Sequence, residues 1–184
     1  DVARAIDIDS SGNVYVTGYS NLSTSNTFDY FTIKYNSTGG SDDYTWNATY
    51  NGGGDDRAYG IKLDNSSNVY VTGSSNYSGA NHFYTIKYDS NGNYIWNLSY
   101  NRTLNDVAYG IDIDSDGYLY VAGTTNGSDF YVIKYNTLTK GIISTTSGAT
   151  PFYTNASSNP INTSLLNEGQ SERVVFWVNA TGPI

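Results

Sequence analysis

The sequence has no cysteine, no methionine and few charges: 14% of its 184 residues are Asp, Glu, Lys or Arg. The lack of cysteine excludes disulfides, thiolate metal sites and a cysteine nucleophile. It leaves an extracellular location open, because disulfides are optional there. No apolar run approaches the roughly 20 residues of a membrane span. No signal peptide is visible, and the missing initial methionine suggests a processed or trimmed piece of something longer.

Basic residues are also scarce, with nine Lys and Arg against seventeen Asp and Glu, for a formal charge of −8. They are spread singly along the chain, so no basic stripe could follow a phosphate backbone. We therefore expect no nucleic-acid partner. Tyrosine is abundant instead, and its 19 copies are large enough to build much of a buried core.

Three stretches of the chain repeat one pattern: Ile6–Gly18 (IDIDSSGNVYVTG), Ile61–Gly73 (IKLDNSSNVYVTG) and Ile111–Gly123 (IDIDSDGYLYVAG). Each stretch alternates apolar and polar residues, is interrupted by a cluster of Asp, Ser, Asn and Gly, and then alternates again. This pattern predicts two short antiparallel strands joined by a tight turn. The chain is therefore expected to be a repeat array.

Each repeat is predicted to contain four strands. The first is expected at Ala3–Asp9, Ala58–Asp64 and Ala108–Asp114, the second at Asn13–Gly18, Asn68–Gly73 and Tyr118–Gly123, the third at Tyr30–Tyr35, Phe83–Tyr88 and Phe130–Tyr135, and the fourth at Tyr44–Tyr50 and Tyr94–Tyr100, with a weakened copy at Gly141–Thr146. Four short strands in about 50 residues correspond to one blade of a β-propeller. Small residues recur in the first strands, where crowding at a propeller axis is expected.

The predicted fold class is therefore all-β, with three four-stranded propeller-type blades and a short C-terminal β segment. The blades are expected at residues 1–55, 56–105 and 106–149, and the C-terminal segment at 150–184. Closed propellers typically have about four to eight blades. Three blades leave apolar faces at both ends of the array, and such faces mark an interface or a missing piece.

The motifs together resemble a known repeat family. A first strand that ends Ile-x-Ile/Leu-Asp, the string NVYVTG, a third strand that ends IKY and a Trp-containing fourth strand before Asp-x-Ala are similar to the β-propeller repeat called SBBP, over about Asp1–Thr146. That family occurs in secreted and surface proteins of bacteria and archaea. The resemblance implies a scaffold or binding module and supplies no catalytic residue.

The tail from Thr150 differs in composition, because it holds all three prolines and both glutamates. Its strongest strand candidate, Arg173–Asn179, is apolar on both faces. The tail resembles the first part of an immunoglobulin-like domain of archaeal surface proteins. About 35 residues are too few for such a sandwich, which needs roughly 100. We expect the domain to be truncated or completed by strands of another molecule.

Glycosylation is the strongest chemical signal. The acceptor pattern Asn-x-Ser/Thr occurs at Asn21, Asn36, Asn47, Asn65, Asn76, Asn97, Asn101, Asn126, Asn155, Asn162 and Asn179. Three of these residues follow the second strand of a repeat by the same spacing, and Asn47 and Asn97 are expected to point away from the tryptophan face of the fourth strand. A surface rich in Asn, Ser and Thr also produces the pattern by accident. We predict that several sites carry N-glycans.

A calcium site is the weak candidate among metal sites. Asp112, Asp114 and Asp116 match the opening of a calcium-binding loop, but the acidic residue expected at the twelfth position is absent and the flanks are strands. The alternative is that aspartates in hairpin turns bond to their own backbone. Asp9, Asp64 and Asp114 occupy one position in all three repeats, which favours the turn role. No metal and no cofactor is therefore predicted.

Residues that do not repeat are the better candidates for catalysis. They are Arg57, His82, Asp116, Lys140, Glu168 and Glu172. His82 is the only histidine, and a solvated loop position without a carboxylate to orient its ring is expected for it. A glycosidase would need two paired carboxylates, and both glutamates lie in the tail. We predict that the protein is not an enzyme. Its tyrosine and tryptophan rings could form a sugar-binding platform, although such rings more often form blade cores.

These observations predict a non-enzymatic extracellular structural protein. It would be an N-glycosylated component of a surface layer or filament, assembled from copies of itself by β complementation between subunits. The alternative is a propeller binding module of a larger secreted protein that recognises carbohydrate or a surface protein.

Overall fold

The computed structural model describes residues 1–21, 27–38, 44–76, 79–102, 104–127 and 129–136. These residues belong to the first of two compact units into which the chain divides, Asp1–Thr137 and Leu138–Ile184. The expected fourth strand at Gly141–Thr146, the boundary after residue 149 and the immunoglobulin-like tail lie outside the described residues and stay predictions. No helix in the described part of the chain is long and apolar enough to cross a membrane.

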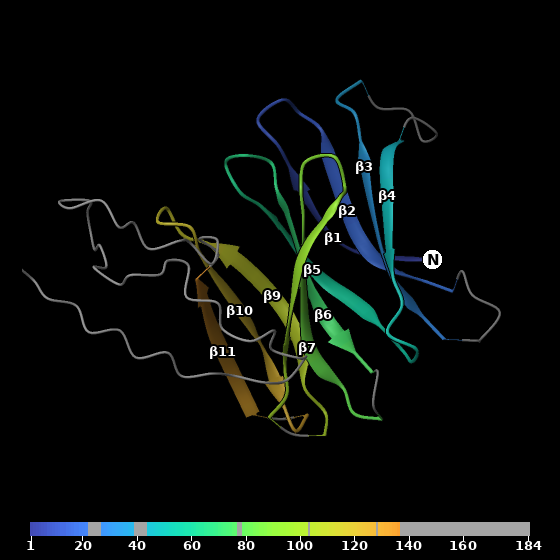
Figure 1. Ribbon diagram of the computed structural model, residues 1–184, viewed down its shortest axis with the longest axis vertical. Helices are drawn as coiled ribbons and strands as arrows, with labels where there is room; N and C mark the ends of the chain where they lie inside the picture. Colours follow the sequence, from blue (N-terminus) through green and yellow to red (C-terminus); the bar gives the residue numbers. More distant parts are fainter. Residues whose placement is uncertain (22–26, 39–43, 77–78, 103, 128, 137–184) are drawn as a thin grey trace, which may run out of the picture. The chain divides into compact units, whose positions relative to one another are not determined.

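Eleven strands form three antiparallel sheets in the described residues (Figure 1). The first sheet contains β1 (Val2–Ile8), β2 (Val14–Ser20), β3 (Asp29–Tyr35) and β4 (Tyr44–Tyr50); the second contains β5 (Arg57–Leu63), β6 (Val69–Ser75), β7 (His82–Tyr88) and β8 (Tyr94–Tyr100); the third contains β9 (Val107–Ile113), β10 (Tyr118–Thr125) and β11 (Asp129–Asn136). Strands adjacent in sequence are adjacent in each sheet. The all-β prediction is confirmed, and we call the sheets blades 1, 2 and 3.

An aspartate closes the turn between the first two strands of every blade. In blade 1, Asp9 Oδ1 accepts hydrogen bonds of 2.9 Å from the backbone N–H groups of Ser11 and Asn13, and the Tyr15 hydroxyl donates to Oδ2 at 3.1 Å. Asp64 and Asp114 make the equivalent bonds in blades 2 and 3. These hydrogen bonds hold the pKa of the Asp9 and Asp114 carboxyls below the usual range, despite partial desolvation that acts the other way. The predicted turn role is confirmed.

Each second strand was predicted to end at the glycine that recurs in all three repeats, but it continues for two residues beyond that glycine. Gly18, for example, lies inside β2, because β1 carries a β-bulge opposite it: Ala3 pairs with Gly18 and Ala5 with Thr17, so Arg4 is an extra residue. A Cβ added to Gly18 would lie 1.9 Å from the carbonyl oxygen of Val2. Only glycine tolerates this approach.

The other two blades repeat the bulge. Tyr59 is the extra residue of β5 and Tyr109 that of β9, and a Cβ on Gly73 or Gly123 would lie 2.0 or 2.1 Å from the opposing carbonyl oxygen. The prediction of a strand end at these glycines was therefore wrong, because their function is to allow a close backbone contact within the sheet.

Two hydrophobic cores lie between neighbouring blades. The first joins Tyr15 and Tyr30 of blade 1 to buried side chains of blade 2, with Trp46 at its edge. The second joins Tyr70 and Phe83 of blade 2 to blade 3. The first strands β1, β5 and β9 are neighbours in space, and a Cβ on Gly60 of β5 would lie 3.0 Å from the Ile111 side chain of β9. The expected requirement for small residues in the first strands is confirmed at this position.

Candidate functional site

Every blade has two chemically different faces. We call the face directed toward the preceding blade the leading face and the face directed toward the following blade the trailing face. The leading face of blade 2 is aliphatic and aromatic, and Val69, Val71 and Ile86 on it are at most 1% exposed under blade 1. The trailing faces carry Tyr, Trp and Lys: Lys34 lies 5.0 Å from the Tyr15 ring centroid in blade 1, and Lys87 lies 4.8 Å from that of Tyr70 in blade 2.

The leading face of blade 1 has the same composition but is open. Ile6 is 63% exposed, whereas Ile61 at the equivalent position of blade 2 is 6% exposed. A groove of about 310 Å³ runs along this face and is lined partly by Val16, Phe31 and Ile33. An aliphatic surface that is buried in blades 2 and 3 is thus presented to solvent by blade 1.

Within the described residues, the trailing face of blade 3 is open as well. Phe130 is 80% exposed, whereas Phe83 at the equivalent position of blade 2 is fully buried. Lys134 lies 5.1 Å from the Tyr120 ring centroid, which repeats the Lys–Tyr pair of the other trailing faces. The two open faces of the described array are therefore of the two types that pack together at each internal blade junction.

Short connectors join successive blades at the end opposite the aspartate turns. In the connector Asn51–Asp56, Asp55 accepts a hydrogen bond of 3.1 Å from the Phe28 backbone N–H of blade 1. The buried Asp56 accepts one of 3.1 Å from the Asn76 N–H of blade 2. Burial raises the pKa of the Asp56 carboxyl, although bonds from Ser75, Gly52 and Asn76 act in the opposite direction. Each connector thus fastens two blades together.

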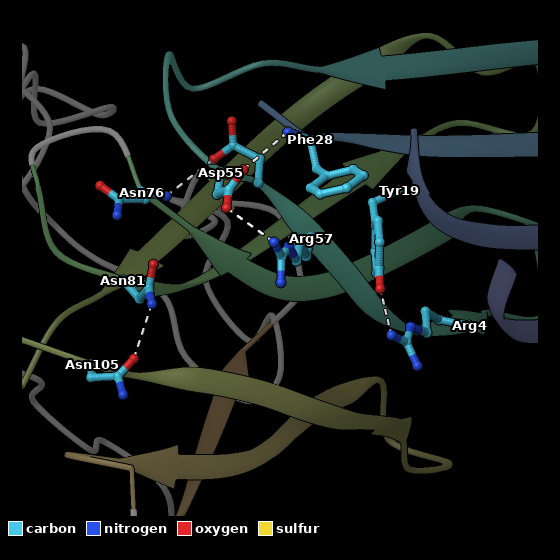
Figure 2. A network of polar contacts seen from close by, with 9 residues as sticks. Arg4, Tyr19, Phe28, Asp55, Arg57, Asn76, Asn81 and Asn105 are labelled. Carbon is cyan, nitrogen blue, oxygen red and sulfur yellow. Dashed lines mark hydrogen bonds and ion pairs between the residues drawn. The ribbon is translucent and has the colours of Figure 1, made fainter. Parts of the chain in front are cut away.

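A polar pocket of about 370 Å³ lies beside these connectors, between blades 2 and 3. Figure 2 shows two of its hydrogen-bonded pairs, Asp55 with Arg57 and Asn81 with Asn105. Its lining consists of Asp55, Arg57, Tyr59, Ser74, Asn76, Asn81, Asn105, Val107 and Tyr109. Arg57 was a sequence candidate because it does not repeat, and the structure places it in this pocket. Asp116, another such candidate, lies in an exposed turn at the end of blade 3 opposite the connectors.

The structure places eight of the predicted glycan acceptors. Five are exposed: Asn21, Asn47, Asn65, Asn101 and Asn126. Three are partly buried: Asn36, Asn76 and Asn97. The other three, Asn155, Asn162 and Asn179, lie outside the described residues. Asn47 and Asn97 pair with Ile33 and Ile86, on the face opposite Trp46 and Trp96, which confirms their predicted direction.

The calcium candidates do not form a common site. Asp112 forms an ion pair of 3.0 Å with Lys62 of the neighbouring blade, and Asp114 accepts the turn hydrogen bonds described above. Within the described part of the chain, no group of three acidic or histidine side chains has a geometry that could hold a metal ion.

His82 differs from its predicted surroundings. It is the first residue of β7 and is only 5% exposed, not a solvated loop residue. Its Nδ1 lies 3.5 Å from Ser99 Oγ and its Nε2 lies 3.2 Å from Asn101 Nδ2. The prediction failed because His82 pairs with Ser75 of β6 and its ring lies beside Ser99 and Asn101, contacts that the local sequence does not reveal. Of the other non-repeating candidates, Lys140, Glu168 and Glu172 lie outside the described residues.

Comparison with known proteins supports the repeat assignment. The profile of the family described as Beta-propeller repeat matches residues 1–22 and 101–131. The first segment covers β1 and β2 of blade 1, and the second covers β9, β10 and the start of β11. No curated protein matches the sequence significantly. The predicted similarity to this repeat family is confirmed for these segments, and it indicates a binding or structural module.

Proposed function

We propose that the protein is a non-enzymatic structural component of an extracellular surface assembly, built by blade-to-blade contact between copies of the chain. One observation carries the proposal: Ile6 on the leading face and Phe130 on the trailing face are exposed, while their equivalents Ile61 and Phe83 are buried at internal junctions. Apolar patches of this kind are typical of interaction sites.

The occupant of each open face is a second copy, because the chain presents both halves of its own junction. The open leading face of one copy matches in composition the leading face of blade 2, and the open trailing face of another repeats the aromatic and lysine pattern of blades 1 and 2. Such a head-to-tail contact joins different surfaces, so it produces a closed ring or an open filament.

N-glycosylation belongs to the same proposal. The exposed acceptors Asn21 and Asn126 lie in or beside the β2–β3 and β10–β11 loops, and Asn65 lies in a turn. Glycans at these positions would coat the ends of the blades and leave the centres of the two open faces uncovered. Asn47 is the exception among the exposed acceptors, because it pairs with Ile33 on the open leading face, so it is expected to carry no glycan in an assembled copy. A coat of this kind suits a protein that assembles outside the cell.

Assembly is tested by measuring the mass of the full chain in solution as its concentration increases. Wild type is expected to form oligomers. Ile6→Lys and Phe130→Lys, which place a charge in one face each, are expected to be monomers. Ile95→Lys is the control, because Ile95 is also exposed, at 44%, but lies on the fourth strand of blade 2.

A mixture of the two interface variants provides the sharper result. Each variant retains one intact face, so the mixture is expected to form dimers of one copy of each and nothing larger. A wild type that is monomeric at every concentration, or a mixture that fails to pair, refutes the assembly. Peptide mass spectrometry of protein from its native source tests the glycans, and unmodified peptides at all exposed acceptors contradict that part.

A further inference from the structure

The three β-bulges place one side chain of each first strand in a row. The extra residues Arg4, Tyr59 and Tyr109 occupy the same position of β1, β5 and β9. The Arg4 guanidinium lies 5.7 Å from the Tyr59 ring centroid, and the rings of Tyr59 and Tyr109 have centroids 5.2 Å apart. A bulge redirects a side chain out of the regular alternation of the strand. The bulges therefore set two tyrosine rings against the polar pocket between blades 2 and 3.

One of these rings is available to a ligand. Tyr109 is 52% exposed and lines the pocket with Tyr59. An exposed ring at the edge of a pocket can pack against the apolar C–H face of a sugar ring. The pocket volume of about 370 Å³ is within the usual range for small-molecule sites.

Amide groups supply the polar wall. The Asn81 Nδ2 donates to Asn105 Oδ1 at 2.9 Å, which fixes both side chains across the blade junction. Asn81 Oδ1 and Asn105 Nδ2 make no other hydrogen bond with the described residues. In Asn76, the side-chain oxygen accepts a bond from the Gly79 N–H, and Nδ2 makes no hydrogen bond with the described residues. One acceptor and two donors are thus fixed at the pocket, and sugar hydroxyls both donate and accept.

The ionic pair in the pocket has no net charge. Arg57 donates to Asp55 Oδ2 at 3.0 Å, and its guanidinium is held 4.8 Å from the Phe28 ring centroid. Among the described residues that line the pocket, only Asp55 and Arg57 are charged. An anionic ligand would have to compete with Asp55 for Arg57, and a cationic ligand would have to compete with Arg57 for Asp55. The lining favours a neutral ligand with several hydroxyl groups.

We propose that this pocket binds a neutral oligosaccharide, with Tyr109 packed on a sugar ring and with the amides of Asn81 and Asn105 on its hydroxyls. The proposal is independent of assembly through the blade faces, since the pocket lies at an internal junction. It assigns a binding role to side chains at the bulge positions, which differ in identity between Arg4 and the two tyrosines.

The test uses the full chain, produced without glycans, against an array of neutral and uronic-acid-containing oligosaccharides, followed by titration of the strongest neutral sugar. We expect neutral sugars to bind, and Tyr109→Ala to weaken binding about tenfold or more. Tyr44→Ala is the matched control, because Tyr44 is 54% exposed at the opposite end of a blade, and it is expected to leave the affinity unchanged.

A second variant tests the role of charge. Asp55→Asn leaves the Arg57 charge uncompensated, so it is expected to shift preference toward the uronic-acid-containing sugars. The proposal is overturned if no neutral sugar binds at millimolar concentration, if acidic sugars bind wild type better than neutral ones, or if Tyr109→Ala binds as well as Tyr44→Ala. Thermal unfolding of each variant confirms that it is folded.

Discussion

The ring of Tyr50 in blade 1 is stacked on the ring of Tyr84 in blade 2, with centroids 4.4 Å apart and planes inclined by 18°. The same contact recurs one blade later, where Tyr100 and Tyr131 are 5.3 Å apart and inclined by 15°. A stacked tyrosine pair thus joins the outermost strand of one blade to the third strand of the next. Phe31 occupies the corresponding position on the open leading face of blade 1.

Removing the buried partner of this stack should be costly. Tyr84 is 2% exposed, and truncation of a buried aromatic residue to alanine typically costs about 3–5 kcal/mol. We expect a loss of that size for Tyr84→Ala in urea-induced unfolding. Tyr44→Ala, at an exposed position, should change the free energy of unfolding by less than about 0.5 kcal/mol. A loss for Tyr84→Ala as small as that for Tyr44→Ala would show that the stacked pair contributes little to the free energy of unfolding.

The contribution of one buried hydroxyl between blades 1 and 2, that of Tyr30, to stability can be measured by removing that group alone. The Tyr30 hydroxyl donates to the backbone carbonyl of Tyr84 at 3.0 Å, and Tyr30 is 1% exposed. Tyr30→Phe should therefore cost about 1 kcal/mol in chemical denaturation. Phe83, at the equivalent position of blade 2, shows that the ring alone fits such a junction, so an unfolded Tyr30→Phe chain would contradict this account.

Two glycines with the same backbone conformation allow the cost of backbone strain to be measured apart from the cost of a side-chain clash. Gly79 and Gly92 both have φ of +83°, but a Cβ on Gly79 meets nothing within 4 Å, whereas one on Gly92 would lie 2.6 Å from the Trp46 ring. Gly79→Ala should cost about 1 kcal/mol from the left-handed backbone. Gly92→Ala should cost about 1–3 kcal/mol more, because overpacking adds to the strain. Differential scanning calorimetry of both variants measures the difference, and similar losses would show that Trp46 moves aside freely.

The pH dependence of stability is tested at Asp29. This residue is 2% exposed, and its Oδ1 has no hydrogen-bond partner among the residues that the structure describes. Burial, and then the charge of Asp56, raise the pKa of Asp29 above its ordinary value of 3.8. The native state therefore holds this proton more tightly than the unfolded state, so the stability contributed by Asp29 falls as the pH rises through its native pKa.

Asp29→Asn removes that penalty. We expect the variant to be about 1 kcal/mol more stable than wild type at neutral pH, and the advantage to shrink as the pH falls toward about 4. Asp129→Asn is the matched control, since Asp129 is the exposed equivalent in blade 3. The comparison requires denaturant unfolding at several pH values. A gain that does not depend on pH would exclude ionisation as its cause.

Much of the fold could be predicted, because the signal is local. The alternation of apolar and polar residues gave β4 and β8 with their observed ends, and recurrence identified Asp9 as a turn residue. The bulges could not be predicted, since a glycine opposite an extra residue has the same sequence signature as a glycine that ends a strand. The burial of His82 and the position of Arg57 beside Asn81 and Asn105 depend on packing between strands and between blades, which no single repeat encodes.

The bulges also determine where this chain can vary. Arg4, Tyr59 and Tyr109 have no paired residue on the neighbouring strand, so replacing their side chains disturbs neither the hydrogen-bond register nor the cores between the blades. The three positions lie next to one another on a rigid sheet framework that does not depend on their side chains. A library randomised at these residues alone should retain folded proteins while sampling new recognition properties, much as loops do on other scaffolds.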